Sequence, residues 1–97
     1  RYLHLVAVFA CNFVNHMYAT AAQLLEKNQI PFDVLLPLID ETAAKVHQLH
    51  PREAQTGPAI RFDKQVMDSH IDLIDDPLIK ELYRLISQSI HKYSLRQ

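Results

Sequence analysis

The stretch from residue 2 to residue 28 constrains the fold more than any other feature of this sequence, because it contains neither proline nor glycine. Its apolar residues recur every three or four positions, which is the spacing of one face of an α-helix. They are Leu3, Ala7, Ala10, Val14, Met17, Ala21, Leu24 and Leu25. The pattern predicts one helix of about seven turns. No segment of the chain shows the sustained alternation of polar and apolar residues that is typical of a half-buried strand.

A second helix is predicted after a short break. Pro31 disfavours helical geometry at the residue before it and therefore ends the first helix. Asp33 is expected to be the N-cap of a helix from Val34 to Leu49. Pro37 would fall in the first turns of this helix, where a missing N–H group is tolerated.

Two more helices complete the prediction, one from Lys64 to Ile74 with Asp63 as N-cap and one from Leu78 to Tyr93. Asp76 is expected to cap the last helix, with Pro77 at its first position. The segment from residue 50 to residue 63 lacks a clear period and is predicted to be a loop with one short turn at residues 52–54. The fold class is therefore all-α, a bundle of four main helices with one long N-terminal helix.

Composition limits the classes of function. The 97 residues suffice for one domain, residues 1–97, and 48% hydrophobic with 22% charged residues excludes general disorder. A net charge of -1 lacks the basic surface expected of a nucleic-acid-binding protein. The sole glycine, Gly57, cannot form a glycine-rich phosphate loop, so the chain has no dinucleotide-binding motif of its own.

The N-terminal segment and the single cysteine give expectations about the cellular location of the protein. The apolar run from Leu3 to Val14 contains His4 and Asn12 and is too short to span a membrane, so we expect a buried helix instead. Cys11 has apolar neighbours and is expected to be a buried, inert thiol; without a disulfide partner it favours the reducing cytoplasm. The chain begins with Arg1 in helix-forming sequence, which indicates a piece of a longer protein.

Six histidines raise the question of a metal site. His47 and His50 are three residues apart at a predicted helix end, but no glutamate gives the HExxH order and no second cysteine is present. We therefore predict no metal site in this chain.

A polar line runs along the long first helix. Asn12, His16 and Thr20 are four residues apart, so they share a face, with Asn15 and Gln23 beside them. This line could simply be the side that faces water. As the lining of a cleft, Asn12 would offer an amide donor and acceptor, and His16 a group that titrates near neutral pH.

The loop AQTGPAIRFD, residues 54–63, is the second candidate. It could be purely structural: Gly57 and Pro58 would form a turn, Asp63 would cap the next helix, and Arg61 would pair with Asp63 or with a helix-end carbonyl. As a site, its most informative residue is Arg61, because a guanidinium offers a planar fork of donors to carboxylates and phosphates.

Four segments carry a resemblance to a known family: HLVAVFACNFVNHMY (residues 4–18), LLPLIDETAA (35–44), PREAQTGPAIRFD (51–63) and LYRLISQSI (82–90). The sequence resembles the C-terminal helical domain of unknown function that follows a Rossmann-like NADP-binding domain in bacterial proteins described as NADP oxidoreductases. Members of this family often have glycine where this sequence has Phe62.

The resemblance implies an architecture shared with 6-phosphogluconate dehydrogenase, in which an all-helical C-terminal domain closes the substrate cleft and commonly builds the dimer. NADP is then expected on an N-terminal Rossmann domain that this chain does not contain. Carried onto the matching positions, the cleft residues would be Asn12 and His16 as catalytic residues, and Gln55, Thr56, Gly57, Arg61 and Asp63 as substrate-binding residues.

These roles form a mechanistic hypothesis. Hydride would pass between nicotinamide and a C–O or C–N centre, while His16 exchanges the proton and Asn12 orients the oxygen. Arg61 would bind an anionic group of a small substrate. The partners expected are the protein's own Rossmann domain and a second copy in a homodimer, because Leu5, Val6 and their neighbours make the first helix apolar on more than one face.

Two other classes stay open at this point. The chain could be a helical protein-interaction or sensor module without catalysis, or a freestanding bundle with no ligand. An enzyme cleft needs Asn12, His16 and Arg61 to converge on one concavity, whereas an interaction module needs an exposed apolar patch.

Overall fold

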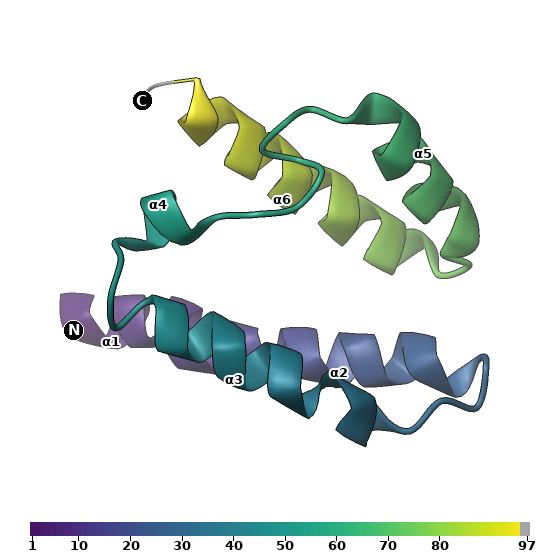
Figure 1. The fold of residues 1–97 in the computed structure, drawn as a ribbon, viewed down its shortest axis with the longest axis horizontal. Helices are drawn as coiled ribbons and strands as arrows, with labels where there is room; N and C mark the ends of the chain where they lie inside the picture. The colour runs from purple at the N-terminus through teal and green to yellow at the C-terminus, as the bar shows by residue number, and fades with distance from the viewer. Residues whose placement is uncertain (96–97) are drawn as a thin grey trace. The chain divides into compact units, whose positions relative to one another are not determined.

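The computed structural model describes residues 1–95, all of whose regular elements are helical (Figure 1). Five helices occur in this range: the long N-terminal helix, α3, the one-turn α4, α5 and α6. The predicted all-α class with a long first helix is therefore confirmed. The chain divides into two compact units, residues 1–39 and residues 40–97, which are described separately below.

The first unit begins with the long helix, which is continuous from Tyr2 to Glu26 but changes its geometry on the way. It consists of α1 (Tyr2–Ala7), a π-helical segment η1 (Val8–Phe13) and α2 (Val14–Glu26). π-Helical turns have i→i+5 hydrogen bonds, are rare, and are frequently found at functional sites. The sequence pattern predicted the helix but not this wider stretch.

The end of α2 is a Schellman motif. The N–H of Ile30 donates to the carbonyl of Leu25, and the N–H of Gln29 donates to that of Glu26. This arrangement requires a left-handed residue after the helix, and Gln29 occupies it with φ 55°. The helix therefore ends by its own capping geometry, and its left-handed residue, Gln29, lies two residues before Pro31.

The second predicted helix differs from expectation at both ends. A 3₁₀ turn, η2 (Phe32–Leu35), leads into α3 (Leu36–Lys45). Asp33 is not the N-cap as predicted, because Pro31, with extended backbone, holds the capping position and Asp33 lies inside the first turn. After Lys45 the chain tightens into turns that reach Gln48, so α3 stops short of the predicted Leu49.

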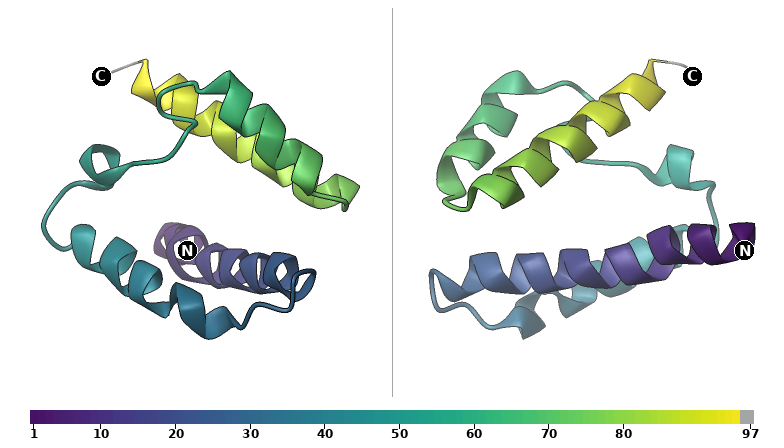
Figure 2. Two further views of the ribbon diagram at one scale, coloured as in Figure 1. Left: turned by 45° about the vertical axis from the view of Figure 1, so that its right-hand side comes forward. Right: turned by 180° about the vertical axis from the view of Figure 1, so that it is seen from behind.

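The second unit contains α4 (Pro51–Ala54), α5 (Lys64–Leu73) and α6 (Pro77–Ser94). The predicted caps of the last two helices are confirmed: Asp63 accepts from the Val66 N–H at 3.3 Å, and Asp76 accepts from Leu78 and Ile79 at 2.8 and 3.3 Å. α5 and α6 form a helical hairpin and lie side by side in every view (Figures 1 and 2).

The core is small. Among the described residues only Ala59, Met67 and Ile74 are buried, and all three belong to the second unit. Lys80 adds a polar contact to the hairpin, since its Nζ donates to the Ile71 carbonyl at 3.0 Å, where a cation is favourable at the C-terminal end of α5.

The apolar stripe of the long helix is exposed in the first unit. No residue of α1, η1 or α2 is buried, and Leu3 and Phe9 are 79% and 62% exposed. The expectation of a buried helix is therefore wrong for the first unit taken by itself, in which only residues 27–39 are available to pack against the helix. Cys11 is likewise exposed rather than buried.

Tyr2–Glu26, with a mean hydropathy of 1.3 over its most apolar window, is the one helix within residues 1–95 that could cross a membrane by length and composition. One such helix is weak evidence, since a core helix of a soluble protein passes the same test. The absence of a membrane role stays a prediction.

Candidate functional site

Asn12 lies in the π-helical segment and His16 in the first turns of α2, and both side chains are exposed. Thr20, the third member of the polar line, donates its hydroxyl to the His16 carbonyl at 3.0 Å. This bond uses the Thr20 side chain inside the helix, so the groups left for a ligand are the Asn12 amide and the His16 ring. The position of Asn12 within a π-segment was not visible in the periodicity.

The candidate loop begins with Gln55, Thr56 and Gly57. The Gln55 side chain donates to the Thr56 carbonyl at 3.0 Å, which fixes the start of the loop. Gly57 has φ +103°, and a Cβ atom placed there would meet nothing within 4 Å. Glycine is therefore needed here for its backbone conformation and not for a close approach of neighbouring atoms.

A second Schellman motif forms the remainder of this loop. The Asp63 N–H donates to the Pro58 carbonyl at 2.9 Å, and the Phe62 N–H donates to the Ala59 carbonyl at 3.1 Å. Phe62 is the left-handed residue, with φ 50°. Glycine is usual at this position of the motif because it adopts the left-handed conformation without strain.

Phe62 has a role that glycine could not fill. Its ring packs against the His91 ring of α6, with centroids 4.5 Å apart and planes tilted by 31°. This contact ties the loop to the last helix. Arg61, the preceding residue, is exposed, and within residues 1–95 it makes no hydrogen bond or ion pair. The predicted pairing of Arg61 with Asp63 or a helix end is thus absent from the described part of the chain.

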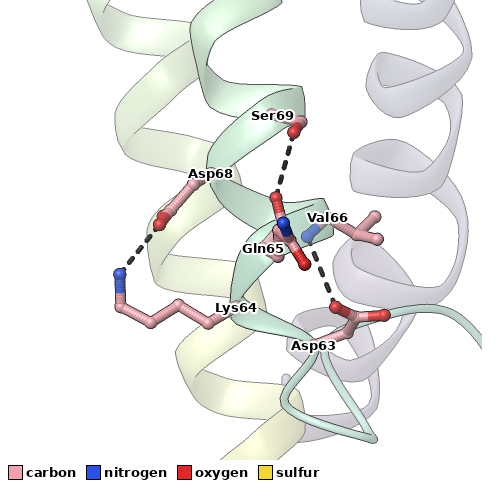
Figure 3. Close-up of polar contacts among 6 residues, drawn as sticks. All are labelled: Asp63, Lys64, Gln65, Val66, Asp68 and Ser69. Atoms are coloured by element: carbon pink, nitrogen blue, oxygen red, sulfur yellow. Dashed lines mark hydrogen bonds and ion pairs between the residues drawn. The ribbon is translucent and has the colours of Figure 1, made fainter.

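Asp63 is the N-cap of α5, as Figure 3 shows. One carboxylate oxygen of Asp63 accepts a hydrogen bond from the Val66 N–H. An ion pair of 2.8 Å between Lys64 and Asp68 links successive turns at the start of the same helix. That exposed pair raises the pKa of the Lys64 ammonium. The structure thus gives Asp63 a capping role, which was one of the two interpretations open from the sequence.

The seven predicted site residues fall into two groups. Asn12 and His16 belong to the first unit; Gln55, Thr56, Gly57, Arg61 and Asp63 belong to the second. In the second unit only Gln55 lines one of the two cavities described next. The convergence of the two groups on one cleft stays a prediction.

The first cavity of the second unit, of about 430 Å³, lies between α4 and the last turns of α6. Its lining residues are His50, Pro51, Arg52, Gln55, Ile60, Ser89, Ile90, Tyr93 and Ser94. The Arg52 guanidinium lies 3.6 Å above the centre of the Tyr93 ring. Sequence analysis missed Arg52; the available signal was an arginine with no acidic residue three or four positions away.

The second cavity, of about 450 Å³, lies along α5 and α6, where Met67, Ile71 and the Phe62 ring contribute apolar surface. Tyr83 lines it and forms a 2.8 Å hydrogen bond with Nδ1 of His70. Partial burial raises the pKa of the Tyr83 hydroxyl. Nδ1 of His91 is buried there without a hydrogen-bond partner.

The described part of the chain lacks the elements that usually bind a dinucleotide. The elements within residues 1–95 include no βαβ unit, and the one glycine stands in a turn and not in a phosphate-binding loop. Residues 1–95 therefore show no dinucleotide-binding motif.

The comparisons with known proteins agree with the helical architecture. A crystal structure described as "putative NADP oxidoreductase BF3122 from Bacteroides fragilis" is similar at 64% identity and a TM-score of 0.91. The match covers 93% of this chain but only 35% of that one, so this chain corresponds to the C-terminal part of a longer protein. No curated protein matches the sequence.

A family model confirms the resemblance found in the sequence, because it matches residues 1–90 and therefore nearly the whole chain. The chain belongs to the family described as domain of unknown function DUF2520.

Proposed function

We propose that this chain is the substrate-cleft and dimerisation domain of an NADP-dependent oxidoreductase, and that it is inactive without a nucleotide-binding domain. The similarity to the Bacteroides fragilis protein carries the proposal, because 64% identity over 93% of this chain is far above what fold similarity alone produces. That protein's description names an NADP oxidoreductase, and the part of it without a counterpart here is long enough for a Rossmann domain.

In this proposal the chain supplies binding and proton transfer, and the redox group comes from the other domain. His16 is exposed and exchanges a proton with the reacting oxygen or nitrogen, while the Asn12 amide orients that atom. Arg61, with no partner within residues 1–95, is available to an anionic substrate group.

Dimerisation is supported by the uncovered apolar surface. The long helix exposes Tyr2, Leu3 and Phe9 at 79%, 79% and 62%, and monomeric proteins rarely leave a large contiguous apolar surface in water. A second copy, together with the nucleotide-binding domain, would cover it. We place the protein in the cytoplasm, where an exposed thiol such as Cys11 stays reduced.

The same exposed surface also favours a second candidate, a helical interaction or sensor module without catalysis. A measurement of enzymatic turnover distinguishes the oxidoreductase domain from the interaction module. The test uses the protein with its flanking chain intact and follows NADPH oxidation against a panel of small carbonyl and imine compounds.

Asn12→Ala and His16→Ala should each lower turnover, about 10²–10⁴-fold for loss of a general acid–base group, and leave NADPH affinity unchanged. Gln65→Ala, an exposed change on α5 away from the predicted site residues, is the control and should have no effect. Full turnover in both variants would refute the catalytic roles, and no turnover of any compound by the parent protein would favour the interaction module.

A further inference from the structure

The cavity between α4 and α6 has the lining of an anion site. None of its lining residues is acidic, and Arg52 carries a permanent positive charge. Arg52 forms no ion pair or hydrogen bond through its guanidinium within residues 1–95, although Glu53 is its neighbour in sequence. No acidic side chain in the described part of the chain therefore pairs with the positive charge of Arg52 in the cavity lining.

Stacking on Tyr93 leaves the donors of Arg52 available. The ring covers a face of the guanidinium at 3.6 Å, whereas the five N–H groups point outward in the guanidinium plane. A stacked guanidinium is held in one orientation, so less side-chain entropy is lost when it binds a ligand. Two parallel N–H groups of such a fork match the two oxygens of a carboxylate or a phosphate.

His50 supplies a second donor with a defined proton. Its Nδ1 accepts the backbone N–H of Arg52 at 3.1 Å. A ring nitrogen that accepts carries no proton, so the neutral ring has its N–H at Nε2. Ser89 adds a hydroxyl to the lining.

The other walls are apolar: Pro51, Ile60, Ile90 and the Tyr93 ring. A cavity of about 430 Å³ lies within the range of sites for small molecules. We propose that this cavity binds a small organic anion, with its carboxylate or phosphate on Arg52 and its hydrocarbon part against the two isoleucines. This inference goes beyond the proposed function, since it requires binding but no redox chemistry, and the anion site on Arg52 is separate from Arg61, which does not line this cavity.

The test is a titration of the isoleucine-methyl-labelled protein, flanking chain intact, with benzoate and with phenyl phosphate. Benzyl alcohol is the uncharged control probe. We expect saturable shifts of the Ile60 and Ile90 methyl signals with at least one anion, and none with benzyl alcohol. Whichever anion binds more tightly identifies the head group, and either order supports the site. Shifts elsewhere, or none with both anions, overturn it.

Variants test whether the positive charge of Arg52 binds the anion. Arg52→Gln should weaken the binding of the anion about tenfold or more, as expected for loss of a charge-assisted pair of hydrogen bonds, and Arg52→Lys should restore part of it. Arg84→Gln removes a matched charge from α6 outside this cavity and should leave the affinity unchanged. Loss of binding in Arg61→Gln but not in Arg52→Gln would overturn the assignment. Because binding is read directly, the inference can hold while the proposed redox function fails, and the reverse.

Discussion

The two left-handed residues of the Schellman motifs allow a quantitative test. Gln29 and Phe62 occupy the same position in two Schellman motifs, with φ 55° and 50°, yet only Phe62 has a ring contact. A left-handed conformation costs a residue other than glycine about 1–2 kcal/mol of stability. Replacement by glycine removes this strain but itself costs about 0.5–1 kcal/mol, because glycine loses more conformational freedom on folding. Gln29→Gly should therefore raise the free energy of unfolding by about 0.5–1 kcal/mol.

Phe62→Gly should act in the opposite direction. The same strain is relieved, but the ring is 54% exposed, so about half of its burial free energy is lost, about 1 kcal/mol. Loss of the stacking contact with His91 adds about 0.5–1.5 kcal/mol. We expect a net loss of about 1 kcal/mol.

Urea unfolding followed by circular dichroism measures both changes. Ala19→Gly, at an exposed position in the middle of α2, is the control and should cost about 1 kcal/mol. The reasoning is refuted if Gln29→Gly is as destabilising as this control, or if Phe62→Gly is the more stable of the two cap variants.

Three further predictions concern the last helix, pH and association. Asp76→Ala should lower the free energy of unfolding by about 1 kcal/mol, since two N–H groups lose their acceptor, whereas Asp76→Asn should restore most of it in urea unfolding. Burial raises the pKa of the Tyr83 hydroxyl, so the stabilising effect of Tyr83 is full below the usual tyrosine pKa and is lost as the pH rises through the raised value. The difference in absorbance at 295 nm between the parent and Tyr83→Phe should therefore titrate above the usual tyrosine range. A midpoint at the usual tyrosine pKa would contradict this. Phe9→Glu, on the exposed face of the long helix, should shift sedimentation from dimer to monomer, and an unchanged dimer would exclude this face from the interface.

Much of the site could not be read from the sequence, because its contacts join residues that are far apart in the chain. The polar line of Asn12 and His16 was visible as a helical spacing, and the loop was visible through its composition. Arg52 was missed, since its significance lies in a stack on Tyr93 of another helix. The role of Asp63 was open until the structure showed its hydrogen bond to the Val66 N–H.

The sequence by itself determined α5 and α6 and their caps, because a cap such as Asp76 acts on N–H groups two and three residues away and a proline acts on its own turn. It could not determine which apolar residues are covered. Cys11 and the stripe of the long helix looked like core from their neighbours in sequence, but exposure depends on what packs against a face, and the described part of this chain offers too little to bury them. Burial and the placing of the Arg52 charge were decided only by the tertiary structure, through contacts that no local pattern records.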